Sequence, residues 1–520
     1  MTRKTWVMAT VLAAGAAAGS PAAAQQQQPA TLTGHAYLPA DTFVPIPDDA
    51  PQALAVSAKF TGPDNLRTEQ LLSIETSSFM SADGVPRMTG ADRPHAGQPV
   101  QGFSGIKPAG DGEWYAMSDN GFGNKPNSPD AMLMVHRVNP DWARGEVELK
   151  NTIYLKDPNK VLPFQLTNEN TETRYLTGSD FDPESFQIVE TDDGETRFWF
   201  ADEFGPYLFA TTPEGVVTDF HQVEVDGEVV RSPDHFALRL PTEPDGSVAF
   251  SVRRSRGLEG MAVSPDGETL YPMFEGPLYR DGSYESSADG QFLRILEFDV
   301  SKEAFTGRSF KYPLAQDGLS IGALNMIDAN SALVIERDWG EGRPARACEG
   351  QPTPDCFNKP AQFKRVYSIS FKGVEDDEFV KKTGYIDLMD IKDPNDKAVL
   401  GGHGDSFSFP FVTIENVHMV DDRHIIVGND NNYGVSMGRK LGRQDHNELI
   451  RLETRELLQQ ALKSSDGANP DRRWAGAGLA EARARRFMAG RRESHLCLCA
   501  SDYARAHARA HASVLSWELH

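Results

Sequence analysis

The stretch GLEGMAVSPDGETLYPMFEGP, residues 257–277, decides the fold because it has the pattern of a complete β-hairpin. Its centre, SPDG at residues 264–267, favours a tight turn, since proline presets a turn φ and Asp-Gly tolerates the remaining turn angles. The flanking runs 261–263 and 270–274 are then expected to pair as antiparallel strands. In such a pair the first residue of one strand lies opposite the last residue of the other, with about 5 Å between their Cβ atoms.

This register places two carboxylates, Glu259 and Glu275, opposite each other at the open end of the hairpin. Like charges in that position repel unless a cation lies between them, so solvated acids at strand ends are the simpler interpretation of any single pair. Because the same pair of positions recurs along the sequence, we favour a cation between the two carboxylates. The same arrangement recurs with Ser104 and Asp119 around Asp111-Gly112, with Glu184 and Asp202 around Asp192-Asp193-Gly194, with Glu415 and Asp430 around Asp421-Asp422, and more weakly with Leu324 and Glu336 around Ala329-Asn330.

The repeats begin about 65 to 90 residues apart, which suits four-stranded blades of a β-propeller and is too long for helical solenoids. Runs rich in β-branched and aromatic residues dominate the sequence, whereas amphipathic helical patterns are few. We therefore expect an all-β protein, a propeller of about six blades around a central channel. Five blades carry the repeat, and the sixth would come from the region before residue 100. Equivalent hairpin ends would then converge at one mouth of the channel.

Several motifs in order, GFSGI…SDNG, DPESF…ADE, GLEG, ERD and TIENV…GNDNN, resemble the esterase-like phytase-domain family over about residues 55–455. The resemblance implies phosphomonoester or phosphodiester hydrolysis on a propeller. Ser104 and Leu324 depart from the acidic pattern. Carried over by motif, the resemblance implies metal ligation by Asp119, Glu184, Asp202, Glu259, Glu275, Glu336, Glu415 and Asp430.

Oxygen ligands of this kind select a hard divalent cation, and calcium accepts six to eight of them in irregular geometry. Amide side chains beside the acids, Asn120, Asn416, Asn429 and Asn431, are candidates to complete the shell. A bound ion would neutralise a phosphoryl group and acidify a water molecule. We therefore expect a divalent cation, calcium in particular, as cofactor.

Catalytic roles are predicted for Glu259, Glu275, Glu336 and Arg337. Arg337 is a candidate phosphate clamp because a guanidinium can bind two oxygens at once, although a salt bridge to its acidic neighbours explains it equally well. Weaker candidates are Lys107 and Arg256 for the clamp, and His403 and His418 for acid or base work.

Three functions remain open. The first is a calcium-dependent phosphoric ester hydrolase that acts on a small phosphorylated substrate. The second is a calcium-dependent lactonase or carboxylesterase, and the third is a binding propeller with a structural ion. The formal net charge of -23 argues against nucleic-acid and anionic-membrane binding and suits a cation.

The chain begins with the three parts of a secretory signal peptide, a basic start, an apolar run and an Ala-rich end, over residues 1–24. We expect a periplasmic or secreted monomer with no membrane insertion. Residues 25–54 are predicted to be a linker or wrapping arm, and residues 55–463 the propeller domain. Residues 464–520, rich in Ala, Arg and His, are expected to be a disordered tail, a basic segment docked on the acidic body, or the product of a shifted reading frame.

Cys348 and Cys356 lie in the loop sequence RACEGQPTPDCF of an exported chain, so a local disulfide is favoured over a metal site. The two late cysteines, Cys497 and Cys499, lie in the aberrant tail and receive no role. Structural zinc is not expected, because no histidine stands at zinc spacing from these cysteines.

Overall fold

The computed structural model describes residues 25–62, 67–68, 78–80, 86–191, 194–238 and 250–464. The predicted signal peptide at 1–24, the turn residues 192–193 and the tail from 465 lie outside the described residues. The fold is an all-β propeller, as expected.

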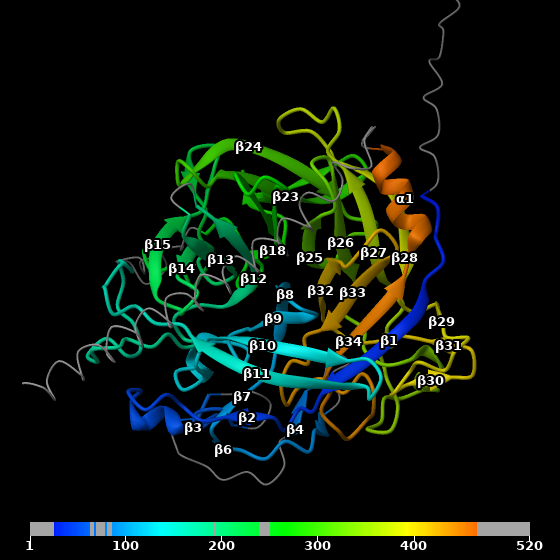
Figure 1. The fold of residues 1–520 in the computed structure, drawn as a ribbon, viewed down its shortest axis with the longest axis horizontal. Coiled ribbons are helices and arrows are strands. Elements are labelled where there is room, and N and C mark those ends of the chain that lie inside the picture. The colour runs from blue at the N-terminus through cyan, green and yellow to red at the C-terminus, as the bar shows by residue number, and fades with distance from the viewer. Residues whose placement is uncertain are drawn as a thin grey trace, which may run out of the picture.

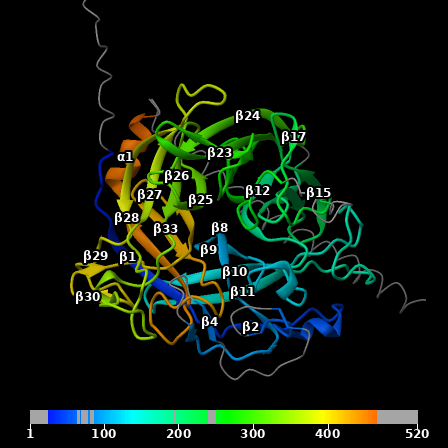
Figure 2. The ribbon, with the colours of Figure 1, turned by 180° about the vertical axis from the view of Figure 1, so that it is seen from behind.

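Five blades, each with four antiparallel strands, are arranged around a centre in Figure 1 and seen from behind in Figure 2. Their innermost strands, β8, β12, β18, β25 and β32, neighbour one another in a closed cycle. Blade one contains β8 (Phe103–Gly110), β9 (Glu113–Ser118), β10 (Met134–Asp141) and β11 (Glu146–Tyr154), and blade two contains β12 (Pro183–Glu190), β13 (Thr196–Asp202), β14 (Tyr207–Thr211) and β15 (Val217–Gln222). Blade three contains β18 (Leu258–Val263), β19 (Thr269–Phe274), β23 (Gly290–Asp299) and β24 (Ala304–Pro313), and blade four contains β25 (Ser320–Met326), β26 (Ser331–Arg337), β27 (Lys364–Ser370) and β28 (Lys381–Asp387).

Blade five joins the two ends of the described chain. It contains β32 (Ile414–Met419), β33 (His424–Asn429), β34 (Asn447–Glu453) and, as its outermost strand, β1 (Thr31–Leu38), which pairs antiparallel with β34. The folded ring therefore extends upstream of the boundary predicted at residue 55. Blades one and five are joined in one larger sheet, because β1 also pairs in parallel with β11. Among the described residues the ring closes with five blades rather than six, because the region before residue 100 contributes β1 and short strand pairs instead of a blade.

The short strands lie outside the blades. They are β2 (Phe43–Val44), β3 (Val56–Ser57), β4 (Ser78–Met80), β5 (Pro86–Met88), β6 (His95–Ala96), β7 (Gln98–Pro99), β16 (Glu224–Val225), β17 (Glu228–Val229), β20 (Tyr279–Arg280), β21 (Ser283–Tyr284), β22 (Ser286–Ser287), β29 (Ile391–Lys392), β30 (Gly402–His403) and β31 (Ser406–Phe407). Three described 3-10 helices span Gln52–Ala55, Lys125–Asn127 and Pro344–Arg346.

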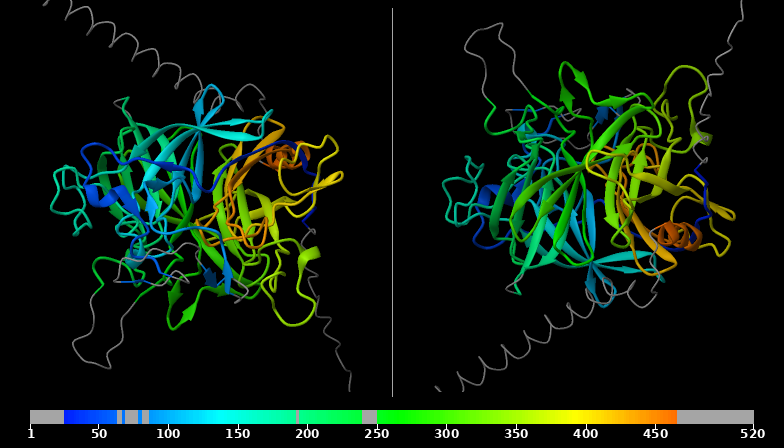
Figure 3. Two further views of the ribbon diagram at one scale, coloured as in Figure 1. Left: turned by 90° about the horizontal axis from the view of Figure 1, so that it is seen from below. Right: turned by 90° about the horizontal axis from the view of Figure 1, so that it is seen from above.

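One α-helix, α1 (Arg455–Ser464), is found in the described part of the chain and packs on the outer strands of blade four (Figures 1 and 3). None of the described helices is long and apolar enough to cross a membrane. The predicted disulfide between Cys348 and Cys356 is confirmed, with 4.9 Å between the Cα atoms.

The hydrophobic core is divided among the interfaces between neighbouring blades. Phe186 and Phe200 of blade two pack with Met117 and Val135 of blade one, and similar clusters fill the other four interfaces. Fully burying one such side chain contributes about 1.5–3 kcal/mol. Each blade is therefore held on both of its faces, and the ring depends on closure.

The predicted hairpin of residues 257–277 is confirmed, with β18 and β19 paired antiparallel in a register that sets Val263 opposite Leu270. The register shifts between Leu258 and Gly260, which makes Glu259 the extra residue of a β-bulge. The innermost strands of the other blades shift at the equivalent place. The bulged residues are Ser104, Glu184, Glu259, Gly322 and Glu415.

In blade four the bulge falls on Gly322, two residues before the Leu324 that the sequence pattern aligned with the acids. Leu324 is buried in the core between blades three and four. The equivalence predicted for Leu324 is therefore wrong. A Cβ atom on Gly322 would lie 2.0 Å from the carbonyl oxygen of Ile414, so the approach of blade five requires glycine here.

A buried polar cluster links all five blades. The Lys107 ammonium on β8 and the Gln187 amide on β12 both donate to Asn325 Oδ1 on β25. The same Gln187 amide donates to the carbonyl oxygen of Met261 on β18, and Asn325 Nδ2 donates to that of Val417 on β32, at 2.7 Å. Burial lowers the pKa of Lys107 to about 7.

Replacing Lys107 by Met is expected to stabilise the protein in a pH-dependent way. The unfolded chain binds more protons than the folded one between the lowered pKa of Lys107, about 7, and the ordinary lysine pKa of 10.5, so this lysine destabilises the fold fully below pH 7 and progressively less above it. The gain from Lys107→Met should be on the order of 3 kcal/mol at pH 6 and shrink towards zero near pH 10. Denaturant unfolding measured across this range tests it, with Lys392→Met at the exposed residue of β29 as control. A gain that does not change with pH contradicts the prediction.

Candidate functional site

Two sets of blade-equivalent residues meet at one end of the ring and line a cavity of about 180 Å³. One set contains the bulged acids Glu184, Glu259 and Glu415. The other set lies at the end of the second strand of each blade. In every blade the residue before the bulge pairs with a residue of the second strand, and the member of this set comes directly after that partner. The set contains Asp119, Glu203, Glu275, Arg337 and Asp430. Asp182 also lines the cavity, which brings eight carboxyl groups and two guanidinium groups, those of Arg256 and Arg337, together.

The structure thus places seven of the predicted residues in the cavity wall: Asp119, Glu184, Glu259, Glu275, Arg337, Glu415 and Asp430. Two others, Asp202 and Glu336, point elsewhere. Asp202 Oδ1 accepts a hydrogen bond from the backbone N–H of Asp182 at 2.8 Å, and Oδ2 accepts one from that of Gly205 at 2.7 Å. The parity of a strand explains the difference, because a shift of one residue moves a side chain to the opposite face.

Glu336 is fully buried outside the cavity. Its carboxylate accepts hydrogen bonds from the Tyr312 hydroxyl at 2.6 Å and from the backbone N–H of Ala315 at 2.7 Å. The Lys382 ammonium supplies its counter-charge at 2.5 Å. Glu336 therefore forms a buried ion pair, and Arg337, one residue later, takes the cavity position of blade four.

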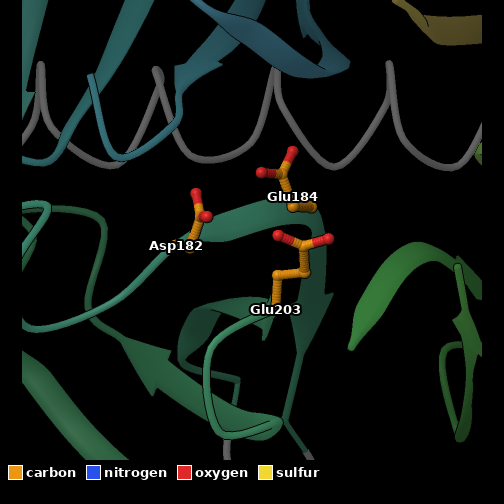
Figure 4. A group of neighbouring side chains, drawn as sticks. All are labelled: Asp182, Glu184 and Glu203. Carbon is orange, nitrogen blue, oxygen red and sulfur yellow. The ribbon is translucent and has the colours of Figure 1, made fainter. Parts of the chain in front are cut away.

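Two cavity acids were missed by sequence reasoning. Asp182 and Glu184 stand two apart in the DPES motif, so the strand pattern puts both on one face, and only Glu184 was selected. Asp202 and Glu203 are adjacent acids, and the sequence does not reveal which of them faces the cavity beside the bulge of the neighbouring strand. Figure 4 shows the side chains of Asp182, Glu184 and Glu203 gathered beside one another.

Three overlapping groups of carboxylates each offer oxygens within 4.8 Å of one another. Any two of the groups have one residue in common, which is Glu184, Glu203 or Glu259. Ligands at the 2.3–2.6 Å typical of calcium lie at such mutual distances. The groups are Asp182, Glu184 and Glu203; Glu184, Glu259 and Glu415; and Glu203, Glu259 and Glu275.

Arg337 is the buried counter-charge of this site, with a side chain only 2% exposed. Its Nη2 lies 3.2 Å from Glu275 Oε1, 3.4 Å from Glu415 Oε1 and 3.8 Å from Glu259 Oε1. Its Nε and Nη1 are buried without a hydrogen-bond partner. The guanidinium also lies over the ring of Trp339, 4.5 Å from the ring centre.

Arg256 stacks on the same Trp339 ring, 4.3 Å from its centre, and its Nη1 pairs with Glu275 Oε2. The Arg256 side chain is 31% exposed, so it marks the opening of the cavity. Glu275 also accepts a hydrogen bond from the Ser320 hydroxyl at 2.7 Å. Two guanidiniums and one hydroxyl therefore satisfy Glu275, in contrast to Glu259, whose Oε1 is buried without a hydrogen-bond partner.

Burial raises the pKa of most cavity carboxyl groups, and their mutual repulsion adds to it. The pKa of Glu184 and that of Glu203 lie well above the usual range, Glu184 beside Asp182 and Glu203 beside Glu275. Burial raises the pKa of Asp182 to about 8, with the charge of Asp119 adding to it. Burial also raises the pKa of Glu415 to about 7, against the opposing effect of Arg337.

These carboxylates suit a divalent cation. Eight oxygen-bearing side chains converge on one small cavity, and the unpartnered Glu259 Oε1 is a buried oxygen that a cation would satisfy. Of the predicted amide ligands, Asn120 lines the cavity and donates to Asp182 Oδ2 at 2.7 Å. The side chains of the other three, Asn416, Asn429 and Asn431, do not line it and donate to backbone carbonyls.

The remaining predicted residues are not assembled with the cavity. Lys107 belongs to the buried cluster that links the blades. His418 is packed edge-on against Trp114, and burial lowers its pKa to about 3. His403 is exposed on β30, a short strand outside the blades. None of these three lines the cavity.

The fold and the site define a five-bladed propeller with an acidic, arginine-containing cavity. Residues 98–433, more than half of the chain, match the phytase-like family described as having the esterase-like activity of phytase. The chain belongs to this family.

A protein of Arthroderma benhamiae, described as an uncharacterized secreted protein, is 28% identical over 207 residues. The match covers 35% of this chain and 40% of that protein, so the chain spans well under half of this relative. Similar solved structures include a GH43 β-1,3-galactosidase, with a TM-score of 0.33 and 10% identity over 69% of this chain and 91% of that chain. The Dos1 propeller has a TM-score of 0.27 and 8% identity over 83% and 95%. At these scores the structural likenesses carry no argument.

Charge-neutralising substitutions at adjacent residues are expected to change stability in opposite directions. In chelator at pH 8, Glu203→Gln should stabilise the protein by on the order of 1 kcal/mol, because it removes a carboxylate whose raised pKa reflects burial and repulsion. Asp202→Asn should destabilise it by about 1–3 kcal/mol. The carboxylate accepts hydrogen bonds from two backbone N–H groups, and the new side-chain amide would turn an N–H donor towards one of them. Denaturant unfolding measures both, and effects of the same sign would contradict the assigned register.

Proposed function

We propose that this protein is an exported, divalent-cation-dependent phosphoric ester hydrolase with its site in the acidic cavity. The observation that carries the proposal is the coexistence of two kinds of recognition in one cavity. Converging carboxylates fit a cation, and a buried arginine with unpartnered Nε and Nη1 atoms fits an anion. A ligand that carries negative oxygens next to a cation satisfies both, and a phosphoryl group is such a ligand.

The family supports the same chemistry through its description, the esterase-like activity of phytase. A bound divalent cation neutralises charge on phosphoryl oxygens and makes water more acidic. The residues that would hold it are Asp182, Glu184, Glu203 and Glu259, which offer carboxylate oxygens. Calcium is the proposed ion, because irregular all-oxygen ligation suits it.

The arginines would bind and orient the substrate. Arg337 would hold phosphoryl oxygens with its two unpartnered groups, while Glu275 and Trp339 fix its guanidinium plane. Arg256 at the opening would contact the part of the substrate that extends outwards. Glu275 is assigned this positioning role rather than the catalytic role predicted for it, since its oxygens are already engaged by Arg256, Arg337 and Ser320.

We further propose that the protein acts outside the cytoplasm, in the periplasm or as a secreted monomer on a small phosphorylated molecule. The related protein of Arthroderma benhamiae is described as secreted. The disulfide between Cys348 and Cys356 agrees with an oxidising compartment.

The proposal predicts phosphoesterase activity that requires both the ion and its ligands. Purified protein assayed with phosphomonoester, phosphodiester and lactone substrates, with calcium or with chelator, should hydrolyse a phosphoric ester only in calcium. Glu184→Gln should weaken calcium binding and lower turnover together, because it removes one of the carboxylate charges proposed to hold the ion. Glu228→Gln on exposed β17 is the matched control.

Three results would contradict this proposal in different ways. Lactone hydrolysis without phosphoesterase activity would favour the lactonase alternative. If Glu184→Gln loses calcium binding but keeps its turnover, the ion is structural. Calcium bound without hydrolysis of any substrate would favour a binding propeller.

A further inference from the structure

We infer that the cavity holds a single divalent cation, bound by Asp182, Glu184 and Glu203 with Glu259 beside them, and that Arg337 occupies the place of a second cation. The inference rests on the proposed function and deepens it, because it fixes the number of ions and the side of the cavity on which the ion binds. It follows from how positive charge is distributed among the three carboxylate groups.

Two of the three groups already have a cation. Arg337 Nη2 lies within 3.8 Å of Glu259, Glu275 and Glu415. The second group contains Glu259 and Glu415, and the third contains Glu259 and Glu275. A divalent ion in either group would be close to a guanidinium that cannot lose its charge, and like charges at this range repel strongly in a buried site.

Among the described residues, the first group has no cation within ion-pair distance: no Lys, Arg or His nitrogen lies within 4.0 Å of a carboxylate oxygen of Asp182, Glu184 or Glu203. Arg256, whose charge acts on Glu203 from farther away, pairs with Glu275 instead. Asn120 is neutral and donates to Asp182 alone. The three carboxylates nevertheless lie together, with oxygens within 4.8 Å of one another (Figure 4).

A second observation points to a ligand at this group. Glu259 is only 3% exposed, and its Oε1 has no hydrogen-bond partner. Glu259 offers one carboxylate oxygen within 4.8 Å of an oxygen of Glu184, and one within 4.8 Å of an oxygen of Glu203, so its carboxylate adjoins the first group. Glu259 Oε1 lies 3.8 Å from Arg337 Nη2, too far for a hydrogen bond, and an ion beside Glu184 and Glu203 would supply the missing partner.

The blade positions explain why an arginine stands there. Four blades carry an acid at the end of the second strand, Asp119, Glu203, Glu275 and Asp430, and blade four alone carries Arg337. Its bulge is Gly322, which has no side chain. Blade four therefore contributes one positive charge to the ring and no carboxylate.

The test is the number of calcium ions bound, counted by equilibrium dialysis with elemental analysis and by titration calorimetry. The wild-type protein should bind one ion. Arg337→Ala should bind two, because the groups around Glu259 then lack their guanidinium. Arg337→Lys, which keeps the charge, and Arg256→Ala, which removes the rim guanidinium, should each bind one.

A second pair of variants tests the side of the cavity without altering Arg337. Glu203→Gln should weaken calcium binding at least tenfold, whereas Glu415→Gln should change it less than threefold. If Arg337→Ala folds only when calcium is added, the count is made on that calcium-bound form. If it does not fold at all, the glutamate pair decides, and equal effects of the two substitutions would overturn the inference.

The outcomes separate this inference from the proposed function. A wild-type protein that binds two ions, or an Arg337→Ala variant that still binds one, overturns the single-ion inference and leaves the hydrolase proposal standing. A wild-type protein that binds no calcium overturns both. One bound ion without phosphoesterase activity overturns the hydrolase proposal alone.

Discussion

The mutual repulsion of eight carboxyl groups around one cavity is the constraint on which this molecule depends. Burial and neighbouring charge raise the pKa of most of these groups, so the ion-free cavity resists full ionisation. Nearby hydrogen-bond donors offset part of the repulsion: the hydroxyl of Ser104 for Glu415, that of Thr413 for Asp430 and the amide of Gln101 for Asp119. None of these neutral groups balances charge, which leaves two arginines to do so.

The rest of the fold keeps these groups in place against their repulsion. Hydrophobic clusters fill the five blade interfaces, and β1 completes blade five, so no blade can withdraw without exposing two core faces. The repeated β-bulge supplies the local geometry, because it turns one residue of each innermost strand out of the ladder. Local charge arrangements that disfavour folding are expected at functional sites, where the remaining structure compensates for them.

Much of this architecture could be predicted from the sequence, because turn chemistry locates hairpins and strand ends recur at a regular spacing. Glu259 and Glu275 follow directly from the Asp-Gly turn between them. The choice of Asp202 over Glu203 failed because a bulge shifts the register by one residue and leaves no mark in a single sequence. The blade number failed for a different reason: β1 pairs with β34 across almost the whole chain, and no local pattern reveals such a partner.

Blade four makes the two sides of the cavity differ in charge. Its innermost strand runs so close to blade five that a Cβ atom on Gly322 would lie 2.0 Å from the carbonyl oxygen of Ile414, so no acid can occupy that bulge. The guanidinium of Arg337 projects from the same blade towards Glu275 and Glu415. The positive charge of Arg337 is thereby fixed on the side of blade four, and the carboxylates without an ion pair, Asp182, Glu184 and Glu203, lie on the side of blade two. A ring of five similar blades thus becomes a site whose two sides differ in charge, which is the asymmetry that the proposed hydrolase requires.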